Sequence, residues 1–365
     1  MKIGIDARMY GTKQRGLGRY VQKLVDGLVK TDTTNEYYVF LTSENIELLK
    51  TNNHRVKKIL FNARWYGFKE QTVGALLLNK YKVDLIHFPH FNVPINYQRK
   101  FIVTIHDLII KHYPNSRATT LPRWQYKIKL MAFDLVLKHA LQKSYKIIAP
   151  SQFVKDDILK NYKLPVEKIE VIYEGYFLDG GHQIADISRL NIKKKFLLYV
   201  GSAYPHKNLE KLVRVFQKIN QAKKYQLVLV GEVDYFYQRL KKEVGEVADV
   251  IYTGYVSEGE LSGLYRQALA YVFPSLFEGF GLPPLEAQAH GVPVVSANSS
   301  SLPEILGDSA VYFNPQDEAE MFKKIQLVLQ NENLRQQLIK AGSENIKRFS
   351  WERMATQTLS LYTNI

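Results

Sequence analysis

Residues that could bind a ligand or take part in a reaction are densest in PSLFEGFGLPPLEAQAHGVPVV, residues 274–295. Two glycines of this stretch follow a strand-like run. Pro283 and Pro284 then open a helix, where proline is tolerated because the first N–H groups have no intrahelical partner. The backbone amides from Gly279 to Leu282, together with the helix dipole, predict an anion site that would suit a diphosphate.

Glu278 and Glu286 flank this loop, eight positions apart. One carboxylate can reach past the phosphate site while the other lies at the edge of the same pocket. A carboxylate that accepts from two vicinal hydroxyls can hold a ribose, as the acidic residue of dinucleotide folds does. Acids at a helix start can also serve only as caps. The position at the carboxyl end of a strand favours ligand binding.

A second anion-binding element is GSAYPHKNL, residues 201–209. A strand ends at Gly201, a loop follows, and Asn208 is expected to cap the next helix. Lys207 stands beside that helix start, where its ammonium could neutralise a phosphate oxygen. The alternative is an ordinary solvated surface charge, but the neighbouring glutamate loop on the same sheet edge favours phosphate binding.

The first half offers weaker signals. In RGLGRY, residues 15–20, Gly16 and Gly18 would let the backbone approach a ligand closely. His106 ends a strand in TIHDLI, where a histidine can be structural or can contact substrate. His87 and His90 end another strand and could line the same site.

The residues or motifs that several kinds of catalytic and metal site require are absent from the sequence. The chain has no cysteine, which excludes disulfides, thiolate metal sites and cysteine nucleophiles. It has no Asp-x-Asp, HExxH, GxSxG, Walker A or kinase signature. We therefore expect no metal, with phosphate charge met by Lys207, amides and helix dipoles.

These groups must be positioned by alternating strands and helices. Strands are predicted at 2–7, 37–42, 56–61, 84–88, 101–106, 146–151, 196–202, 226–231, 250–255, 270–275 and 293–298. Helices are predicted at 17–30, 65–80, 122–143, 208–220, 234–245, 257–268, 283–290 and 317–348, with a last one after Ser350 as N-cap. This alternation predicts two doubly wound α/β domains with parallel sheets, facing one another across a cleft. The boundary is expected near 176–195, which contains a Gly pair and a Lys run.

Charge is distributed unevenly along the 365 residues. Residues 1–150 hold 25 Lys and Arg against 10 Asp and Glu, whereas residues 151–365 hold 25 of each. This asymmetry indicates an anionic partner for the first half, an anionic acceptor or membrane surface rather than nucleic acid, unless it is simply a basic surface. We find no signal-like start and no long apolar span, so we expect a cytoplasmic protein.

Residues 201–209, 274–295 and 300–315, together with IDAR, GLGRY and IHD in the first half, resemble family 4 of the retaining glycosyltransferases, which have the GT-B fold. EGFGLPPLEA matches that family's E-x7-E motif. The resemblance implies an acceptor-binding Rossmann-like domain at 1–175 and a nucleotide-sugar donor domain at 176–350. It also implies that helix 351–365 crosses back to the first domain.

The resemblance further implies that His106, Glu278 and Lys207 are catalytic. The donor-binding residues that it implies are Gly16, Gly18, Ser202, Lys207, Gly254, Tyr255, Val256, Glu278, Phe280, Gly281, Leu282 and Glu286. Many members have an arginine where this chain has Ser202. Lys207 would then share the phosphate charge with another cation, for which Arg19 is a candidate, or the donor site is arranged differently.

We therefore expect a retaining hexosyltransferase that moves mannose from GDP-mannose to a glycan or polyprenyl-linked acceptor, as bacterial surface-polysaccharide enzymes do. Alternatives are a UDP-sugar-dependent glucosyl or N-acetylglucosaminyl transferase, a GT-B sugar-nucleotide epimerase, a phosphorolytic enzyme, or a non-catalytic nucleotide-sugar binder. The predicted helix 122–143 carries lysines around an apolar stripe, which suits either peripheral contact with an anionic membrane or a core helix with a basic face.

Overall fold

The computed structural model describes residues 1–12, 15–63, 65, 67, 69–114, 119, 121–176 and 185–364. The chain forms two compact units: unit 1, Met1–Gly175 with Ser350–Ile365, and unit 2, Tyr176–Phe349. Within the described ranges, no helix is both long enough and apolar enough to cross a membrane.

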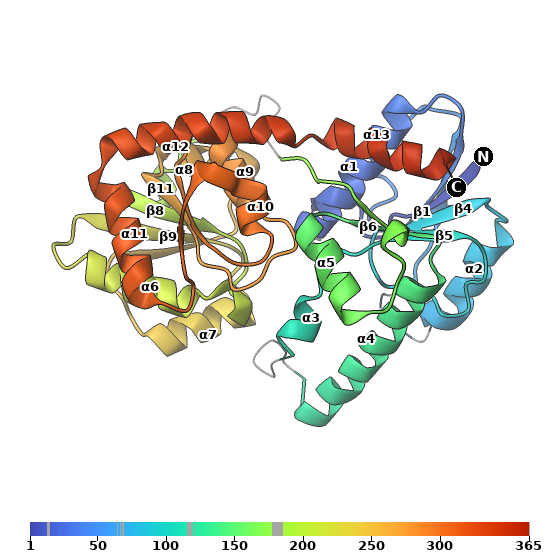
Figure 1. Ribbon diagram of the computed structural model, residues 1–365, viewed down its shortest axis with the longest axis horizontal. Coiled ribbons are helices and arrows are strands. Elements are labelled where there is room, and N and C mark those ends of the chain that lie inside the picture. The colour runs from blue at the N-terminus through green and yellow to red at the C-terminus, as the bar shows by residue number, and fades with distance from the viewer. Residues whose placement is uncertain are drawn as a thin grey trace. The chain divides into compact units, whose positions relative to one another are not determined.

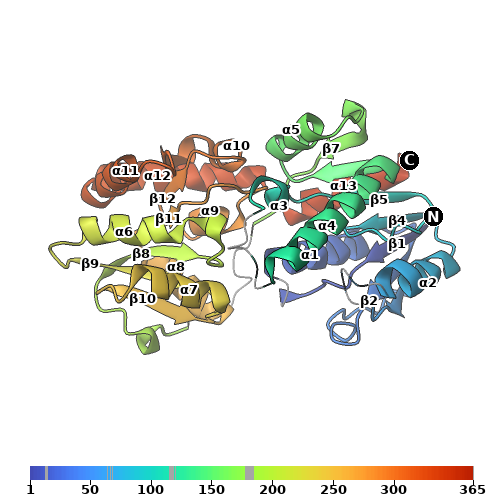
Figure 2. The same ribbon diagram turned by 90° about the horizontal axis from the view of Figure 1, so that it is seen from below.

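Unit 1 is built on a parallel seven-stranded sheet with the order β3-β2-β1-β4-β5-β6-β7. Its strands are β1 (Lys2–Asp6), β2 (Glu36–Leu41), β3 (Val56–Leu60), β4 (Leu85–Phe88), β5 (Phe101–Thr104), β6 (Lys146–Ala149) and β7 (Ile169–Val171). Its helices include α1 (Arg15–Thr31), η2 (Glu70–Gly74), α2 (Ala75–Lys80), α3 (Ile109–His112), α4 (Arg123–Lys143), α5 (Gln152–Asn161) and α13 (Trp351–Thr363). Figures 1 and 2 show helices on both faces of the sheet.

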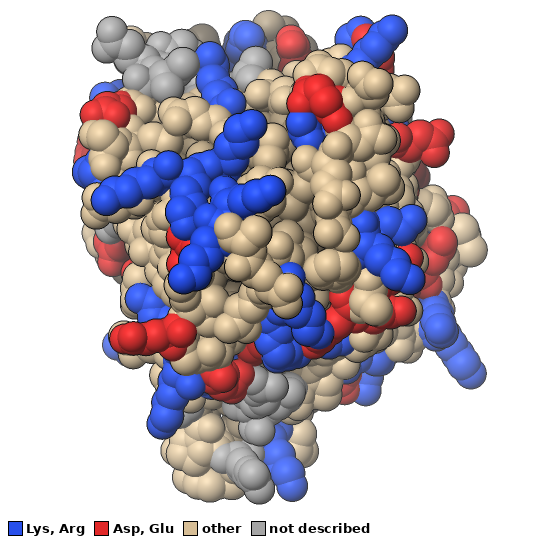
Figure 3. Space-filling model, turned by 90° about the vertical axis from the view of Figure 1, so that its left-hand side faces the viewer, with Lys and Arg blue, Asp and Glu red and all other residues tan. Residues whose placement is uncertain are grey.

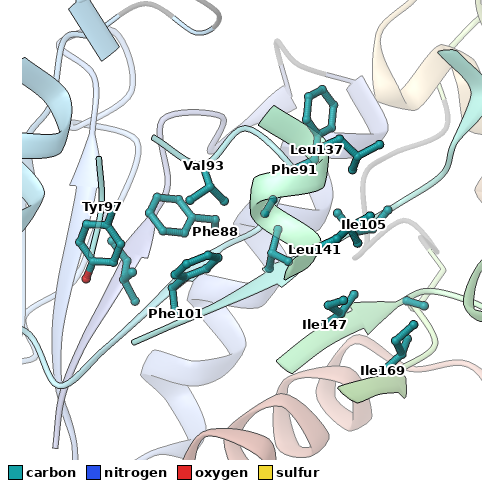
Figure 4. Packing of buried hydrophobic residues seen from close by; sticks show 14 of the residues in the cluster. Phe88, Phe91, Val93, Tyr97, Phe101, Ile105, Leu137, Leu141, Ile147 and Ile169 are labelled. Carbon is teal, nitrogen blue, oxygen red and sulfur yellow. The ribbon is translucent and has the colours of Figure 1, made fainter. Parts of the chain in front are cut away.

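The side chains of β2 show why helices cover both faces of this sheet. Tyr37, Val39 and Leu41 belong to a core cluster with α1 and α13, whereas Tyr38 and Phe40 belong to a second cluster with α2, α4 and α5. Side chains alternate between the faces of a strand, so a continuous apolar run buries both faces. Figure 4 shows the second cluster, in which aromatic rings from β4 and β5 meet the C-terminal half of α4.

Unit 2 has a parallel six-stranded sheet with the order β10-β9-β8-β11-β12-β13. Its strands are β8 (Lys195–Val200), β9 (Tyr225–Val230), β10 (Val250–Gly254), β11 (Ala270–Phe273), β12 (Val294–Ala297) and β13 (Ala310–Phe313). Its helices include α6 (Leu209–Ile219), α7 (Tyr235–Val244), α8 (Glu258–Gln267), α9 (Leu282–Ala289), α10 (Leu302–Leu306), α11 (Glu318–Gln330) and α12 (Glu332–Asn345). The strand order reverses beside the first strand of each sheet, as in doubly wound folds, which confirms the predicted fold class.

Some elements differ from the prediction. The hydrophobic pattern did not predict five elements: β7, α3, α5, α10 and β13. These elements are short, or they directly follow a segment with a stronger pattern. The predicted helix at 317–348 is two helices, because Asn331 interrupts it and its side chain accepts from the Leu334 N–H as the N-cap of α12.

The final helix packs on the first. The Ser350 hydroxyl accepts from the Arg353 N–H, as predicted for an N-cap. A Cβ at Gly27 of α1 would lie 2.5 Å from the Cβ of Ala355, so only glycine permits this helix contact. The close approach places α13 in the core of unit 1, although α13 follows all of unit 2 in the sequence.

Candidate functional site

The central charged pair of unit 2 joins the loop between β11 and α9 to the loop after β8. Glu278 Oε1 lies 2.6 Å from Lys207 Nζ, and the two side chains are only 11% and 17% exposed. Lys207 comes from the loop after β8, the strand next to β11. The carboxyl ends of neighbouring parallel strands meet at one sheet edge, and this brings together two residues 71 positions apart.

A row of serines holds the Glu278 loop in place. Ser300 Oγ accepts from the Glu278 N–H at 2.8 Å. The Ser301 hydroxyl donates to the carbonyls of both Glu278 and Phe280, and Ser299 donates to the Ser275 carbonyl. The loop is therefore fixed before any ligand arrives. Sequence reasoning assigned no role to these serines, although SSS at 299–301 directly after β12 was a usable signal.

Gly281 makes the turn into α9. Its φ is +112°, a conformation that favours glycine, and a Cβ there would lie 3.0 Å from a methyl group of Leu302, which would have to move. Prolines occupy the next two positions after Leu282 and offer no N–H. Within the described part of the chain, the N–H groups of Gly281 and Leu282 have no protein acceptor, which leaves them available to an anion.

Glu286 lies on the first turns of α9 and is 5% exposed. Its Oε2 accepts from the Tyr265 hydroxyl at 3.0 Å. Nearby, burial raises the pKa of the Tyr271 phenol, and the charges of Glu286 and Glu278 raise it further. Both acids of the E-x7-E pattern thus lie close enough to one buried phenol for their charges to act on it.

The loop after β8 differs from the prediction in one detail. Asn208 does precede α6, but it has a left-handed backbone (φ 60°) and its side chain makes no cap. Its amide instead donates to the carbonyls of Pro274 and Pro315. Asn208 therefore ties the Lys207 loop to the Glu278 loop, and the expected capping role is wrong.

The remaining donor candidates of unit 2 lie at the same ends of β8 and β10. The Ser202 carbonyl accepts from the Tyr199 hydroxyl. Gly254 has a φ of +72° and is followed by Tyr255, whose side chain is 81% exposed, and Val256. An aromatic ring held outward at a strand end is a surface on which a base could stack.

In unit 1, His106 follows β5 and has partners at both ring nitrogens. Nδ1 lies 3.1 Å from Glu174 Oε1, and Nε2 lies 3.0 Å from the Pro89 carbonyl oxygen. Burial lowers the pKa of His106, but the hydrogen bond and charge of Glu174 and the bond to Pro89 outweigh burial, so the pKa is raised. Two acceptors suit an imidazolium that donates from both nitrogens. A ligand contact through a ring nitrogen requires one of these bonds to open.

His87 is a structural residue, so the expectation that it lines the site is wrong. It is fully buried, with Nδ1 2.6 Å from the Tyr362 hydroxyl and Nε2 2.8 Å from Thr104 Oγ1. Burial, followed by the charge of His106, lowers the pKa of His87 to about 3. His90 is also a neutral ring, since burial and then the charges of His106 and Arg8 lower its pKa to about 3.

Gly16 and Gly18 lie in the first turn of α1. Residues 13 and 14, which precede that helix, lie outside the described residues. A ligand contact at these glycines would be made at the N-terminal turn of α1.

A buried charge network at the end of β1 escaped sequence reasoning. Arg8 donates to both carboxylate oxygens of Asp6, to Glu70 Oε1 at 2.6 Å and to the Ala63 carbonyl. Asn92 also donates to Glu70. A small cavity lies against this network, lined by Asp6, Arg8, Met9, Val21, Trp65, Pro89, His90 and Asn92. The IDAR sequence was its only local signal.

No group of three or more His, Asp or Glu side chains that could hold a metal occurs within the described ranges. The ionisable groups of the candidate site in unit 2 are thus a carboxylate–ammonium pair and a second, hydrogen-bonded carboxylate.

Two doubly wound units, each with a parallel sheet, define the GT-B class of glycosyltransferase folds. Sucrose-phosphate synthase from Thermosynechococcus elongatus has this arrangement with a TM-score of 0.75 and 22% identity, covering 100% of this chain and 98% of that one.

Family models match nearly the whole chain: "Glycosyltransferase Family 4" matches residues 14–179 and "Glycosyl transferases group 1" matches residues 182–345. The chain belongs to glycosyltransferase family 4. O-antigen chain mannosyltransferase B of Escherichia coli is 28% identical, over 95% of each chain. O-antigen chain mannosyltransferase RfbU of Salmonella typhimurium is also 28% identical, over 90% of this chain and 88% of that one.

Proposed function

We propose that this glycosyltransferase transfers mannose from GDP-mannose, with retention at the anomeric carbon, to a glycan or lipid-linked saccharide. The observation that carries the proposal is the Lys207–Glu278 pair beside the Gly281 turn, with Glu286 held by Tyr265 a short distance along α9. The mannosyl assignment is supported by the two relatives, which are named as O-antigen mannosyltransferases.

In this proposal unit 2 binds the donor. The amides of Gly281 and Leu282 and the Lys207 ammonium receive the diphosphate. Glu286 accepts from the ribose hydroxyls, and Glu278, no longer paired only with Lys207, accepts from the sugar. Tyr255 and its neighbours contact the base. Each protein group is complementary to the part of the donor that it binds: hydrogen-bond donors face the phosphates, acceptors face the hydroxyls, and an apolar ring faces the base.

The reaction breaks the bond between the anomeric carbon and the diphosphate oxygen while the acceptor hydroxyl attacks from the same face. The departing phosphate takes the hydroxyl proton, so no covalent enzyme intermediate is needed. Negative charge grows on the leaving diphosphate, and Lys207 with the two amides stabilises it from fixed positions. Such electrostatic stabilisation is usually the largest part of catalysis.

Unit 1 is proposed to bind the acceptor. The cavity beside the Arg8 network is about the size of one water molecule, so we propose that its Asp6 carboxylate, Asn92 amide and Trp65 indole form one edge of the acceptor site and do not enclose a sugar. The imidazolium of His106 is proposed to face the reacting sugar. The excess of lysine and arginine in residues 1–150 suits an acceptor joined to phosphate. We place the reaction at the cytoplasmic side of a membrane that holds this acceptor.

A thermal-shift panel of GDP, UDP and ADP and their sugar conjugates tests the donor site. A ligand at 100 times its Kd stabilises the protein by about 2.7 kcal/mol, so the preferred base is readily detected. We expect stabilisation by GDP and GDP-mannose that is lost in Glu286→Ala and kept in Glu246→Ala, a control at an exposed residue of the same unit. A preference for UDP would overturn the mannose assignment, and no response to any nucleotide would overturn the donor site.

Transfer itself is tested by release of GDP from GDP-mannose with and without a saccharide acceptor. We expect acceptor-dependent release that is unchanged by EDTA, since Lys207 and amides take the role of a metal. Loss of activity with EDTA and recovery with Mg²⁺ would overturn the metal-independent mechanism. Phosphate-dependent release of mannose 1-phosphate would instead identify a phosphorolytic enzyme.

A further inference from the structure

The N-terminal half of α4 has an apolar stripe that faces away from the core. Trp124, Ile128, Met131 and Leu135 are 63%, 58%, 73% and 56% exposed. Their spacing puts them within about 60° of one another around the helix and over about 16 Å along it. Five of the seventeen exposed large apolar side chains in the described part of the chain fall in residues 121–135.

The opposite side of α4 is the one that packs on unit 1. Leu137, Ala140 and Leu141 are fully buried in the core, with Phe133 packed against it. Figure 4 shows Leu137 and Leu141 on the side of the helix that faces the sheet. The helix is thus apolar on two opposite sides, although the fold needs only one. A second apolar side points to a second apolar environment.

Basic residues flank the exposed stripe. Residues 121–145 contain five Lys and Arg and one acidic residue, Asp134, which is paired with Lys138 at 2.6 Å. Lys127, Lys129 and Lys143 are exposed. An apolar stripe with Trp at one end, Lys127 at its edge and further exposed lysines on the same helix is the pattern of a helix that lies in the interface of an anionic bilayer.

Unit 2 provides a contrast. Figure 3 looks onto its face with α6 and α11, where both signs of charge are present. On this face Glu318 pairs with both Arg214 and Lys218, so some of the basic side chains are neutralised in place. The first half of α4 differs in position as well: in Figure 1 it extends beyond the other elements of unit 1.

We propose that α4 is a membrane-docking helix: Trp124, Ile128, Met131 and Leu135 enter the interface of an anionic bilayer, and the flanking lysines bind its headgroups. This inference extends the proposed function, because a lipid-linked acceptor lies in a membrane. Vesicle binding needs neither donor nor acceptor, so it can fail while nucleotide binding and transfer succeed, and the reverse is also possible.

The test is co-sedimentation of the full chain with vesicles of phosphatidylcholine, alone or with about one third phosphatidylglycerol. We expect binding to the anionic vesicles only. Ile128→Ser/Met131→Ser should weaken it by about a hundredfold, because two large apolar side chains no longer leave water. The matched control is Val233→Ser/Leu327→Ser, which removes two exposed apolar side chains from unit 2 and should bind like the wild type.

The lysines are tested separately. Lys127→Gln/Lys129→Gln should weaken binding by about thirtyfold at low salt, since each lysine near an anionic surface contributes about 1 kcal/mol. Lys323→Gln/Lys340→Gln makes the same charge change at exposed lysines of unit 2 and should have no effect.

Trp124 is retained in these variants and reports insertion. Its emission should shift to the blue with anionic vesicles, and Trp124→Phe should abolish the shift although Trp65 and Trp351 remain. The variants alter exposed residues, and an unchanged thermal shift with the preferred nucleotide would establish that they fold.

Three results would overturn the proposal: no vesicle binding by the wild type, equal loss in the unit 2 controls, or binding that is the same on neutral and anionic vesicles. Concentration-dependent dimerisation that Ile128→Ser/Met131→Ser abolishes, without vesicle binding, would identify a second copy of the chain as the occupant of the stripe.

Discussion

The two units each bury an acid beside a cation near the carboxyl ends of their strands, but they do so with different chemistry. In unit 2 the cation is the Lys207 ammonium, 2.6 Å from Glu278. In unit 1 it is His106, 3.1 Å from Glu174, whose charge depends on pH. A fixed cation suits a constant ligand charge such as a diphosphate. A histidine can change its charge and its hydrogen bonds near neutral pH.

The two pairs are also held differently. Glu278 is fixed through its own backbone by Ser300 and Ser301, so its carboxylate can exchange partners while the loop stays in place. His106 is held by both of its ring nitrogens, so a change of partner alters the ring itself. The comparison predicts that substitutions in unit 2 separate binding from stability more cleanly than substitutions in unit 1.

The largest expected effect tests the pair in unit 2. Lys207→Met should lower kcat/KM by about a thousandfold, because the leaving diphosphate loses its fixed cation. It should also destabilise the unit by about 2 kcal/mol, since Glu278 is left mostly buried and unpaired. Thermal unfolding and GDP release measure the two effects.

The control is Lys207→Met/Glu278→Gln. It should recover most of the stability, because no unpaired charge remains, but none of the activity. Recovery of both would mean that Lys207 acts only as a structural partner of Glu278.

Substitution of Gly281, compared with that of Gly245, distinguishes the effect of backbone strain from the effect of a changed anion site. Gly281→Ala should cost about 2 kcal/mol of stability, from a Cβ at φ +112° that meets Leu302, and should weaken GDP binding at least about tenfold. Gly245 has a φ of +73° with open space around its Cβ position, so Gly245→Ala imposes strain alone. Equal loss of GDP binding in the two variants would argue against an anion site at Gly281.

Glu174→Gln tests the titrating pair through pH. Burial lowers the pKa of His106, but Glu174, the Pro89 carbonyl and Asp107 together raise it by more, so the folded pKa lies above the unfolded value of about 6.5. The stability that protonation adds is fully present below about pH 6.5 and is lost as pH rises through the folded pKa. The wild type should therefore exceed Glu174→Gln in Tm most clearly at acidic pH.

That Tm difference should shrink toward alkaline pH, where His106 is neutral in both proteins. Glu170→Gln, at an exposed residue of β7, should give a small Tm difference that does not follow this profile. A Tm difference for Glu174→Gln that stays constant from pH 5 to pH 9 would contradict a protonated His106.

The smallest effect is expected at Tyr255. Its side chain is 81% exposed, so Tyr255→Ala should leave the stability unchanged within about 0.5 kcal/mol. If the ring stacks on the base, KM for the donor should rise about fivefold with little change in kcat, as the loss of one aromatic contact predicts. An unchanged KM would remove Tyr255 from the donor site.

Much of the fold followed from local pattern. Continuous apolar runs at β1, β2, β8 and β9 predicted buried parallel strands because both faces of such strands need apolar side chains. Strand β7 was not predicted, because its three residues are too few to form a recognisable apolar run. The division at Asn331 was missed because two amphipathic helices in succession resemble one long helix when only apolar spacing is considered.

Local sequence pattern was enough to predict the α/β class, most of the parallel strands in both series, and the loop and helix that carry Glu278, Gly281 and Glu286. Spacing within one strand–loop–helix unit is a local property, and parallel strands bring their carboxyl ends to one edge. Only the tertiary structure decided the partners: Lys207 for Glu278, Glu174 for His106 and Tyr362 for His87. These contacts join residues 68 to 275 positions apart. Burial at such contacts sets which histidine is charged, and no sequence pattern records it.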